Sequence, residues 1–318
     1  MGRPTTFSLA PFSGMGTSPA DRVWASLSPE ARATLEALPA SDLQTLLLSL
    51  AKDRAAGVTT ARVAERWRQD AFVRPSDQDP RVLGALEMEL WAHLPQSFAA
   101  LELSPVAPFG TCATLGDVDQ NRVLTTTRTS EVVSDHTAVL ALEAARRRDT
   151  DRKVHLAAMH RVLRTQRFPA GFSQHFRLLA LVSSARDTGS GRTEAELLTQ
   201  HLAFYVAALS SLCPHDLVRV RLTTLGSKAV AERIQDTVLP ALGPLPANVE
   251  IVDDPDRTRG RGYYRDVALR IDVVRDGTEL EVGDGGFTDW TARLRADAKE
   301  RCLTTCVSTE RLSALQPP

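Results

Sequence analysis

The chain has 318 residues, of which 43% are hydrophobic and 24% charged, and its formal net charge is −1. This size and composition are typical of a globular protein with one large domain or two ordinary ones. The nearly neutral charge excludes a global basic field for nucleic acids, so only a local basic face could bind them. The sequence contains no apolar run of about 18 residues, which argues against a membrane-spanning helix and a membrane partner.

The N-terminal residues 1–19 are rich in Gly, Pro, Ser and Thr and lack the continuous apolar stretch of a signal peptide. We predict a flexible leader and a cytoplasmic protein. The four cysteines favour free thiols in a reducing compartment. The CxxxC spacing of Cys302 and Cys306, together with Cys213 and His215, leaves a zinc site as the alternative, but we expect no metal site.

Residues 20–79 are predicted to form a helical N-terminal segment followed by a linker. Three stretches have apolar residues at helical spacing or a residue that favours a helix start: 28–38, 41–56 and 59–72. They are interpreted as an accessory helical bundle, and a helix-turn-helix module is the alternative. The segment VRPSDQDP, residues 73–80, has two prolines and is predicted to be the linker.

Residues 80–318 alternate between helices and short strands, which predicts an α+β fold with an antiparallel or mixed sheet flanked by helices. A helix is expected from residue 80 to about 95, and two more over about 194–212 and 227–242. The strongest strand candidates are 123–129, 175–184, 217–225, 263–275 and 278–286. Asp276-Gly277 between the last two predicts a hairpin turn.

Two motifs in the first half of this region are similar to signature stretches of class II aminoacyl-tRNA synthetases, the histidyl branch above all. VVSDHTAVLALEAARR, residues 132–147, resembles the family's Arg-Pro-Glu-Gly-Thr segment, with Asp135 and Thr137 on its acidic residue and threonine. RVLRTQRFPAGFSQHFRLLALVSSA, residues 161–185, resembles motif 2, a strand, a loop and a second strand. Arg164 falls on the motif 2 arginine, Gly171 on the loop glycine, and Gln166 replaces a glutamate.

Two further motifs follow in the family's order, and the first of them has two parts. RTRGRGYY, residues 257–264, matches the histidyl-type Arg-Gly-x-x-Tyr-Tyr motif at Arg259, Tyr263 and Tyr264. DGGFTDW, residues 284–290, resembles the family's glycine-glycine turn at Gly285 and Gly286. CLTTCVSTERL, residues 302–312, resembles motif 3, with Arg311 on its arginine but without the preceding glycines.

The resemblance implies a site in which a carboxylate is joined to the α-phosphate of ATP. It implies ATP and Mg²⁺ as the cofactors. It implies that Arg164, Arg259 and Arg311 are catalytic and that Arg164, Gln166 and Arg311 bind the nucleotide. It assigns the acid substrate to Asp135, Tyr263, Tyr264, Gly285 and Gly286. Guanidinium groups suit this role because they are always charged and present a rigid fork of donors to phosphate oxygens. Class II cores dimerise near motif 1, here residues 83–110, so the resemblance also implies a homodimer.

Several departures indicate that the activity differs from charging histidine to tRNA. The positions that read histidine in the family are Leu178 and Val182, which cannot pair with an ammonium or imidazole group. The region between the second and third motifs is short, and the chain ends near motif 3, so neither the inserted nor the anticodon-binding domain is expected. We therefore regard tRNA as an improbable partner.

These observations leave three functions open. The first is a synthetase paralogue without tRNA-charging activity that binds ATP, a small amino or carboxylic acid, or both, and activates the acid if it is an enzyme. The second is a non-catalytic regulatory or metabolite-sensing subunit that acts on a partner protein, a fate for which the synthetase-like regulatory subunit of ATP phosphoribosyltransferase is a precedent. The third, supported only by TTARVAERW, is a DNA-binding regulator that uses the N-terminal helices.

Overall fold

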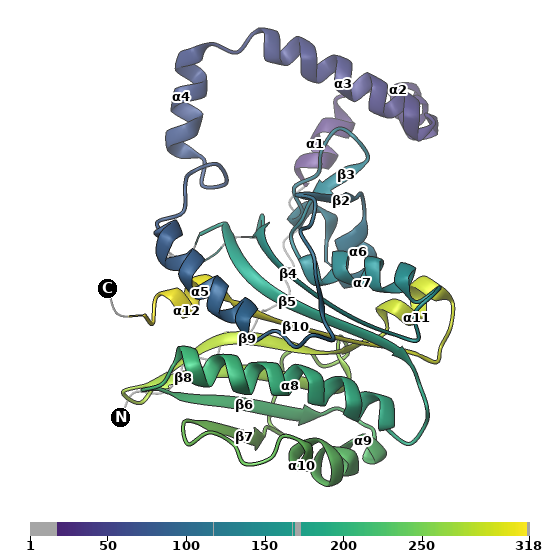
Figure 1. Cartoon of the computed structure of the whole chain (residues 1–318). Helices are drawn as coiled ribbons and strands as arrows, with labels where there is room; N and C mark the ends of the chain where they lie inside the picture. The colour runs from purple at the N-terminus through teal and green to yellow at the C-terminus, as the bar shows by residue number, and fades with distance from the viewer. Residues whose placement is uncertain (1–17, 117, 167, 169–172, 317–318) are drawn as a thin grey trace. The chain divides into compact units, whose positions relative to one another are not determined.

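The computed structural model describes residues 18–116, 118–166, 168 and 173–316 (Figure 1). The predicted leader therefore lies almost wholly outside the described residues. Contacts between Cα atoms divide the chain into two compact units, residues 1–59 and 60–318. Within the described residues, no helix is both long and apolar enough to cross a lipid bilayer.

The first unit consists of helices whose starts are set by local chemistry. Ser28 caps α2 (Pro29–Ala37) by accepting a hydrogen bond from the Ala31 amide, and Ser18 forms a capping box with Asp21 at α1 (Pro19–Ala25). The third helix of this unit is α3 (Ala40–Ala56). None of these helices has a buried residue, and leucines such as Leu47 and Leu50 on α3 are exposed.

An eight-stranded mixed sheet forms the centre of the second unit, which confirms the predicted fold class. The strand order is β1-β4-β5-β10-β9-β8-β6-β7, and every pair is antiparallel except β1 with β4 and β6 with β7. The strands are β1 (Ala99–Ala100), β4 (Lys153–Leu163), β5 (His175–Arg186), β6 (Leu217–Thr224), β7 (Val249–Asp253), β8 (Arg265–Arg275), β9 (Thr278–Thr288) and β10 (Glu300–Ser308).

Alternation along the strands separates the two faces of this sheet. On β5, Leu179 and Leu181 enter the larger core with α8, whereas Ala180 and Val182 enter a second core with α7. The two helices therefore cover opposite faces of the sheet (Figure 1). The helices of this unit are α4 (Thr60–Gln69), α5 (Pro80–Ala92), α6 (Thr111–Gly116), α7 (His136–Arg147), α8 (Arg192–Leu212), α9 (Lys228–Arg233), α10 (Leu239–Ala241), α11 (Trp290–Arg295) and α12 (Thr309–Ser313).

Most predicted elements are present, and the Asp276-Gly277 turn joins β8 to β9 with both residues at positive φ. The helix expected over 227–242 contains a π-helical turn at Ile234–Val238 between α9 and α10. The strand predicted over 123–129 is wrong. The strand in this region is β3 (Ser130–Val132), which pairs with β2 (Val106–Pro108). The predicted stretch contributes a single isolated bridge, Thr125 to Glu131 of β3, and Thr129 has a φ of 30°. The threonine-rich stretch is therefore a connection that leads into the short β2–β3 ribbon, despite its high strand propensity.

Candidate functional site

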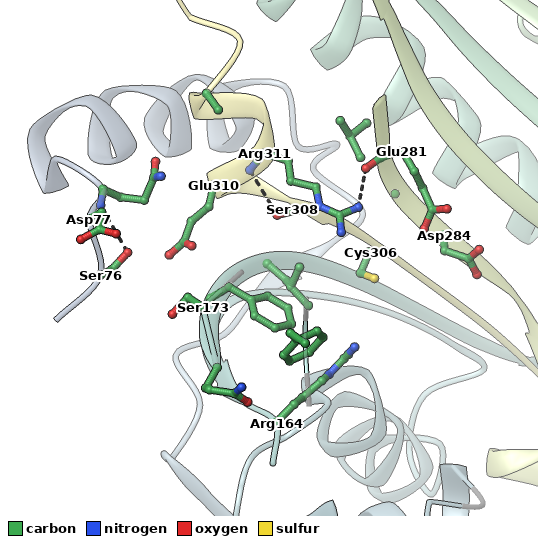
Figure 2. Close-up of a pocket in the computed structure, with 18 of the residues that line it drawn as sticks. Ser76, Asp77, Arg164, Ser173, Glu281, Asp284, Cys306, Ser308, Glu310 and Arg311 are labelled. Atoms are coloured by element: carbon green, nitrogen blue, oxygen red, sulfur yellow. Dashed lines mark hydrogen bonds between the residues drawn. The ribbon is translucent and has the colours of Figure 1, made fainter. Parts of the chain in front are cut away.

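A cavity of about 590 Å³ opens on the sheet face that also carries α7, next to the start of α12 (Figure 2). Its floor comes from β5, β9 and β10, and its walls come from the loop after β4, α12 and the segment that precedes α5. The side chains that line it include Arg74, Ser76, Asp77, Gln78, Arg164, Phe168, Phe176, Leu178, Arg259, Glu281, Asp284, Cys306, Glu310 and Arg311. All three arginines that the sequence singled out therefore line one cavity.

Arg164 follows the last residue of β4, so the end of a long strand of the sheet fixes its position. Its Nε donates a hydrogen bond to the carbonyl oxygen of Ser134 at 3.0 Å, and its guanidinium lies 5.3 Å from the ring centre of Phe176. Figure 2 shows the guanidinium directed into the cavity, toward Cys306. The fixed Nε leaves the terminal nitrogens of the fork as the part that a ligand would meet.

Glu281 on β9 holds the other two arginines. Arg259 donates from Nη1 to both carboxylate oxygens of Glu281, at 2.8 and 3.0 Å, and Arg311 donates from Nη1 to the Glu281 carbonyl at 2.6 Å. Arg311 is further positioned by Ser308, which caps α12 by accepting a hydrogen bond from the Arg311 amide. A phosphate that binds Arg259 would have to compete with the Glu281 carboxylate.

Asp284 and Arg257 form a buried pair that the sequence did not single out. The guanidinium of Arg257, whose side chain is 5% exposed, contacts the Asp284 carboxylate at 2.8 and 3.1 Å and donates to the carbonyls of Arg259 and Leu269. The Tyr264 hydroxyl donates to the same carboxylate at 2.8 Å. Burial raises the pKa of Asp284, and Arg257 opposes that rise. The pair fixes the loop that carries Arg259.

The two predicted glycines lie in the body of β9, and the expected glycine-glycine turn is wrong. A Cβ on Gly285 would lie 2.5 Å from the carbonyl oxygen of Thr304, and one on Gly286 would lie 2.6 Å from the Tyr264 ring. Gly286 therefore makes room for the tyrosine, and Gly285 for the neighbouring strand β10. Tyr263 stacks edge-on against Tyr264, with ring centres 4.8 Å apart. These glycines and tyrosines are not among the residues that line the cavity.

The remaining predicted site residues also lie outside the cavity lining. Asp135 caps α7, where its carboxylate accepts hydrogen bonds from the amide and the hydroxyl of Thr137. Gln166 is exposed in the loop after β4, and Gly171 lies outside the described residues. Of the two positions that read histidine in the resembled family, Leu178 lines the cavity, whereas Val182 is fully buried in the core with α7.

Two of the cysteines that suggested a zinc site lie on β10. Cys302 is buried, and the half-buried Cys306 lines the cavity opposite Asp284 on the neighbouring strand. Burial raises the pKa of Cys306, so its thiol is protonated at neutral pH. Within the part of the chain that the structure describes, no three His, Cys, Asp or Glu side chains are grouped so that they could hold a metal ion.

His136, the first residue of α7, gives the protein a predicted sensitivity to acid. It is completely buried, and burial lowers its pKa to about 4. Because the folded-state pKa is below the unfolded value of about 6.5, its stabilising contribution is complete above pH 6.5 and declines as the pH falls toward 4. The loss should reach about 3 kcal/mol. Denaturant unfolding at pH 7 and pH 4.5 should show a smaller difference for His136→Leu than for wild type, whereas the exposed His215→Leu should leave the difference unchanged.

Comparison with known proteins gives the class of the fold. No protein-family model matches the sequence, and no curated protein matches it. Solved structures do match: the apo histidyl-tRNA synthetase of S. aureus aligns with a TM-score of 0.55 and 15% identity, over 76% of this chain and 68% of that one. A histidine–tRNA ligase subunit from Alicyclobacillus acidocaldarius aligns with a TM-score of 0.54 and 12% identity, over 76% of this chain and 94% of that one.

The described core therefore has the fold of a class II aminoacyl-tRNA synthetase catalytic domain, and its structural neighbours include the histidyl type, as the motifs predicted. A Bacillus halodurans protein described as an ATP phosphoribosyltransferase regulatory subunit/histidyl-tRNA synthetase shares this fold. It aligns with a TM-score of 0.56 and 12% identity, over 76% of this chain and 81% of that one. At these identities the likeness concerns the fold alone.

Proposed function

We propose that the cavity binds ATP together with a small amino or carboxylic acid, in a synthetase-fold protein that does not charge tRNA. The observation that carries the proposal is the meeting of Arg164, Arg259 and Arg311, which come from three separate motifs, at one cavity. Such a set of guanidinium groups is suited to bind a ligand with several negative charges, such as a polyphosphate. The volume of about 590 Å³ is within the usual range for a site that holds a nucleotide-sized ligand.

The acid would occupy the end of the cavity near Leu178 and Cys306. Neither side chain can pair with an imidazole or a second charged group, and the nearby carboxylate of Asp284 is already paired with Arg257 and Tyr264. A small, largely apolar acid therefore suits this end better than histidine does. If the protein is an enzyme, a carboxylate oxygen of the acid forms a bond to the α-phosphorus of ATP. The bond from that phosphorus to the bridging oxygen breaks, and pyrophosphate leaves.

The three arginines would stabilise the charge that develops on the phosphoryl oxygens, since they are already oriented by Ser134 and Glu281. Magnesium would neutralise the phosphates. Glu281 and Glu310 supply carboxylates on the cavity wall, but Arg259 and Arg161 pair with them. Such a site suits an ion that arrives with the nucleotide better than one held by the protein alone. By analogy with the fold, the protein would work as a homodimer.

A regulatory or metabolite-sensing subunit is the second candidate. Glu281 already neutralises Arg259, and Gln166, which stands in place of the resembled family's glutamate, lies outside the cavity lining. Both features favour binding without turnover. The Bacillus halodurans structure, whose description names a regulatory subunit, shows that this fold is found in such proteins.

ATP–pyrophosphate exchange with pooled amino acids and small carboxylic acids separates the two candidates. Exchange that depends on one acid supports the enzyme, and Arg259→Ala should then abolish it. ATP binding without exchange supports the sensor. The absence of both ATP binding and exchange would refute the proposed function in either form.

A further inference from the structure

One wall of the cavity comes from a segment that the sequence indicated to be only a linker. Residues 71–78, called the strap below, connect the region of α4 to α5 and contribute Ala71, Arg74, Pro75, Ser76, Asp77 and Gln78 to the lining. In Figure 2, Ser76 and Asp77 lie on the far side of the cavity from Glu281 and Asp284, with Glu310 between them. The strap therefore closes the cavity at the end away from Asp284.

Hydrogen bonds anchor the strap to the elements that carry the arginines. The Nε2 atom of His175, on β5, lies 2.7 Å from the carbonyl oxygen of Arg74, and its Nδ1 lies 2.9 Å from Nη1 of Arg161. Arg161 in turn pairs with Glu310, at 2.9 Å, next to Arg311 on α12. The strap is thus tied to the same strands and helix that position Arg164 and Arg311.

A second tie follows directly after the strap. Asp79 caps α5, and Glu87 on that helix pairs with Arg177 on β5 at 2.7 Å. The hydroxyl of Thr309, the first residue of α12, also donates to Glu87 at 3.3 Å. The strap is therefore held at Arg74 and at its C-terminal end, which is the arrangement expected of a wall that contacts a ligand rather than of a free connection.

The cavity lining combines apolar rings with polar groups of the strap. Phe168 and Phe176 line the cavity and meet edge to face, with ring centres 6.2 Å apart, and the Arg164 guanidinium lies over the Phe176 ring. Each ring offers an apolar surface for a base close to the phosphate-binding Arg164. On the strap, Asp77 offers a carboxylate acceptor, Ser76 a hydroxyl and Gln78 an amide that both donates and accepts.

We propose that the strap recognises the nucleoside part of the nucleotide, with Asp77 accepting hydrogen bonds from the ribose hydroxyls and Gln78 contacting the base or ribose. This inference rests on the proposed function, because it needs a nucleotide whose phosphates lie at Arg164 and Arg311. It assigns the specificity for the nucleoside to the strap, which lies outside the four motifs.

Calorimetric titration of the full chain with MgATP and with inorganic tripolyphosphate tests the inference. The double variant Asp77→Ala/Gln78→Ala should bind ATP about 10- to 100-fold more weakly than wild type, since it loses hydrogen bonds to a charged and a polar group. Its affinity for tripolyphosphate should be unchanged. The matched control is Gln235→Ala/Asp236→Ala, an exposed Gln-Asp pair in the π-helical turn, and it should bind both ligands like wild type.

A second variant keeps the shape of the strap. Asp77→Asn should reduce the preference of the protein for ATP over 2′-deoxy-ATP, because an amide is a poorer acceptor for the 2′-hydroxyl than a carboxylate. Unchanged ATP affinity in the double variant, or an equal loss of ATP and tripolyphosphate, would overturn the inference while the proposed function stands. Failure of the wild-type protein to bind either ligand would instead refute the proposed function, and the inference with it.

Discussion

Replacing Arg164 with alanine should lower any adenylate-forming activity by about 10²- to 10³-fold, the usual effect of removing one preorganised donor from a charged transition state. The structure supports a large effect because the guanidinium enters the cavity from the end of β4 and its Nε donates a hydrogen bond to Ser134. If the protein binds ATP without turnover, the same variant should bind ATP at least tenfold more weakly. Exchange kinetics and calorimetry measure the two quantities.

The conservative variant Arg164→Lys should recover only part of the loss, because an ammonium group lacks the planar fork. Arg152→Ala is the matched control, since this exposed arginine lies just before β4, at the other end of the strand. It should behave like wild type. If the Arg152 and Arg164 substitutions lowered activity or ATP affinity equally, the effect would come from the change in the net charge of the protein and not from the cavity.

Replacing Arg148 with methionine should destabilise the protein by about 3–5 kcal/mol, because it leaves the buried carboxylate of Glu300 without its main partner. The two side chains are only 7% and 2% exposed, and two hydrogen bonds of 2.9 and 3.0 Å join them. The lower end of the range is expected, since Arg295 stays within 3.6 Å of Glu300. Chemical denaturation followed by circular dichroism measures the free energy of unfolding.

Arg146→Met provides the comparison for this stability prediction. Arg146 lies two residues earlier and pairs with Glu143 at 2.7 Å, but its side chain is 69% exposed. The loss of stability should therefore be far smaller than for the Arg148 variant, because water screens an exposed ion pair. Neither variant changes a residue that lines the cavity, so ATP affinity should stay at the wild-type value in both. If the free energy of unfolding fell by a similar amount in the two variants, burial would not be what makes the Arg148–Glu300 pair important for stability.

Much of the fold could be predicted from the sequence because its signals are local. The caps at Ser28 and Ser227, the Asp276-Gly277 turn and the alternation along β5 each depend on residues close together in the chain. The three arginines could be chosen because each stands inside a short motif with a fixed order. The threonine-rich stretch 123–129 shows the limit of such signals, since strand formation there depends on a partner that only the tertiary fold supplies.

The parts of the site that were missed depend on contacts between distant segments. Asp284 directly precedes the glycine pair and Arg257 opens the third motif, yet nothing in either motif shows that the two form a buried pair across 27 positions. The hydrogen bonds from Arg259 and Arg311 to Glu281 could not be predicted for the same reason. The strap was hidden because two prolines and several polar residues are equally typical of a linker and of a binding loop.

The measurement that tests the central claim most directly is a calorimetric titration of the wild-type protein with MgATP, repeated with the variant Arg164→Ala/Arg311→Ala. The arrangement of the cavity predicts saturable binding to the wild-type protein and at least a hundredfold weaker binding to the double variant, with both proteins equally folded by circular dichroism. Absence of ATP binding to the wild-type protein, or equal affinity in the double variant, would contradict the assignment of this cavity to a nucleotide.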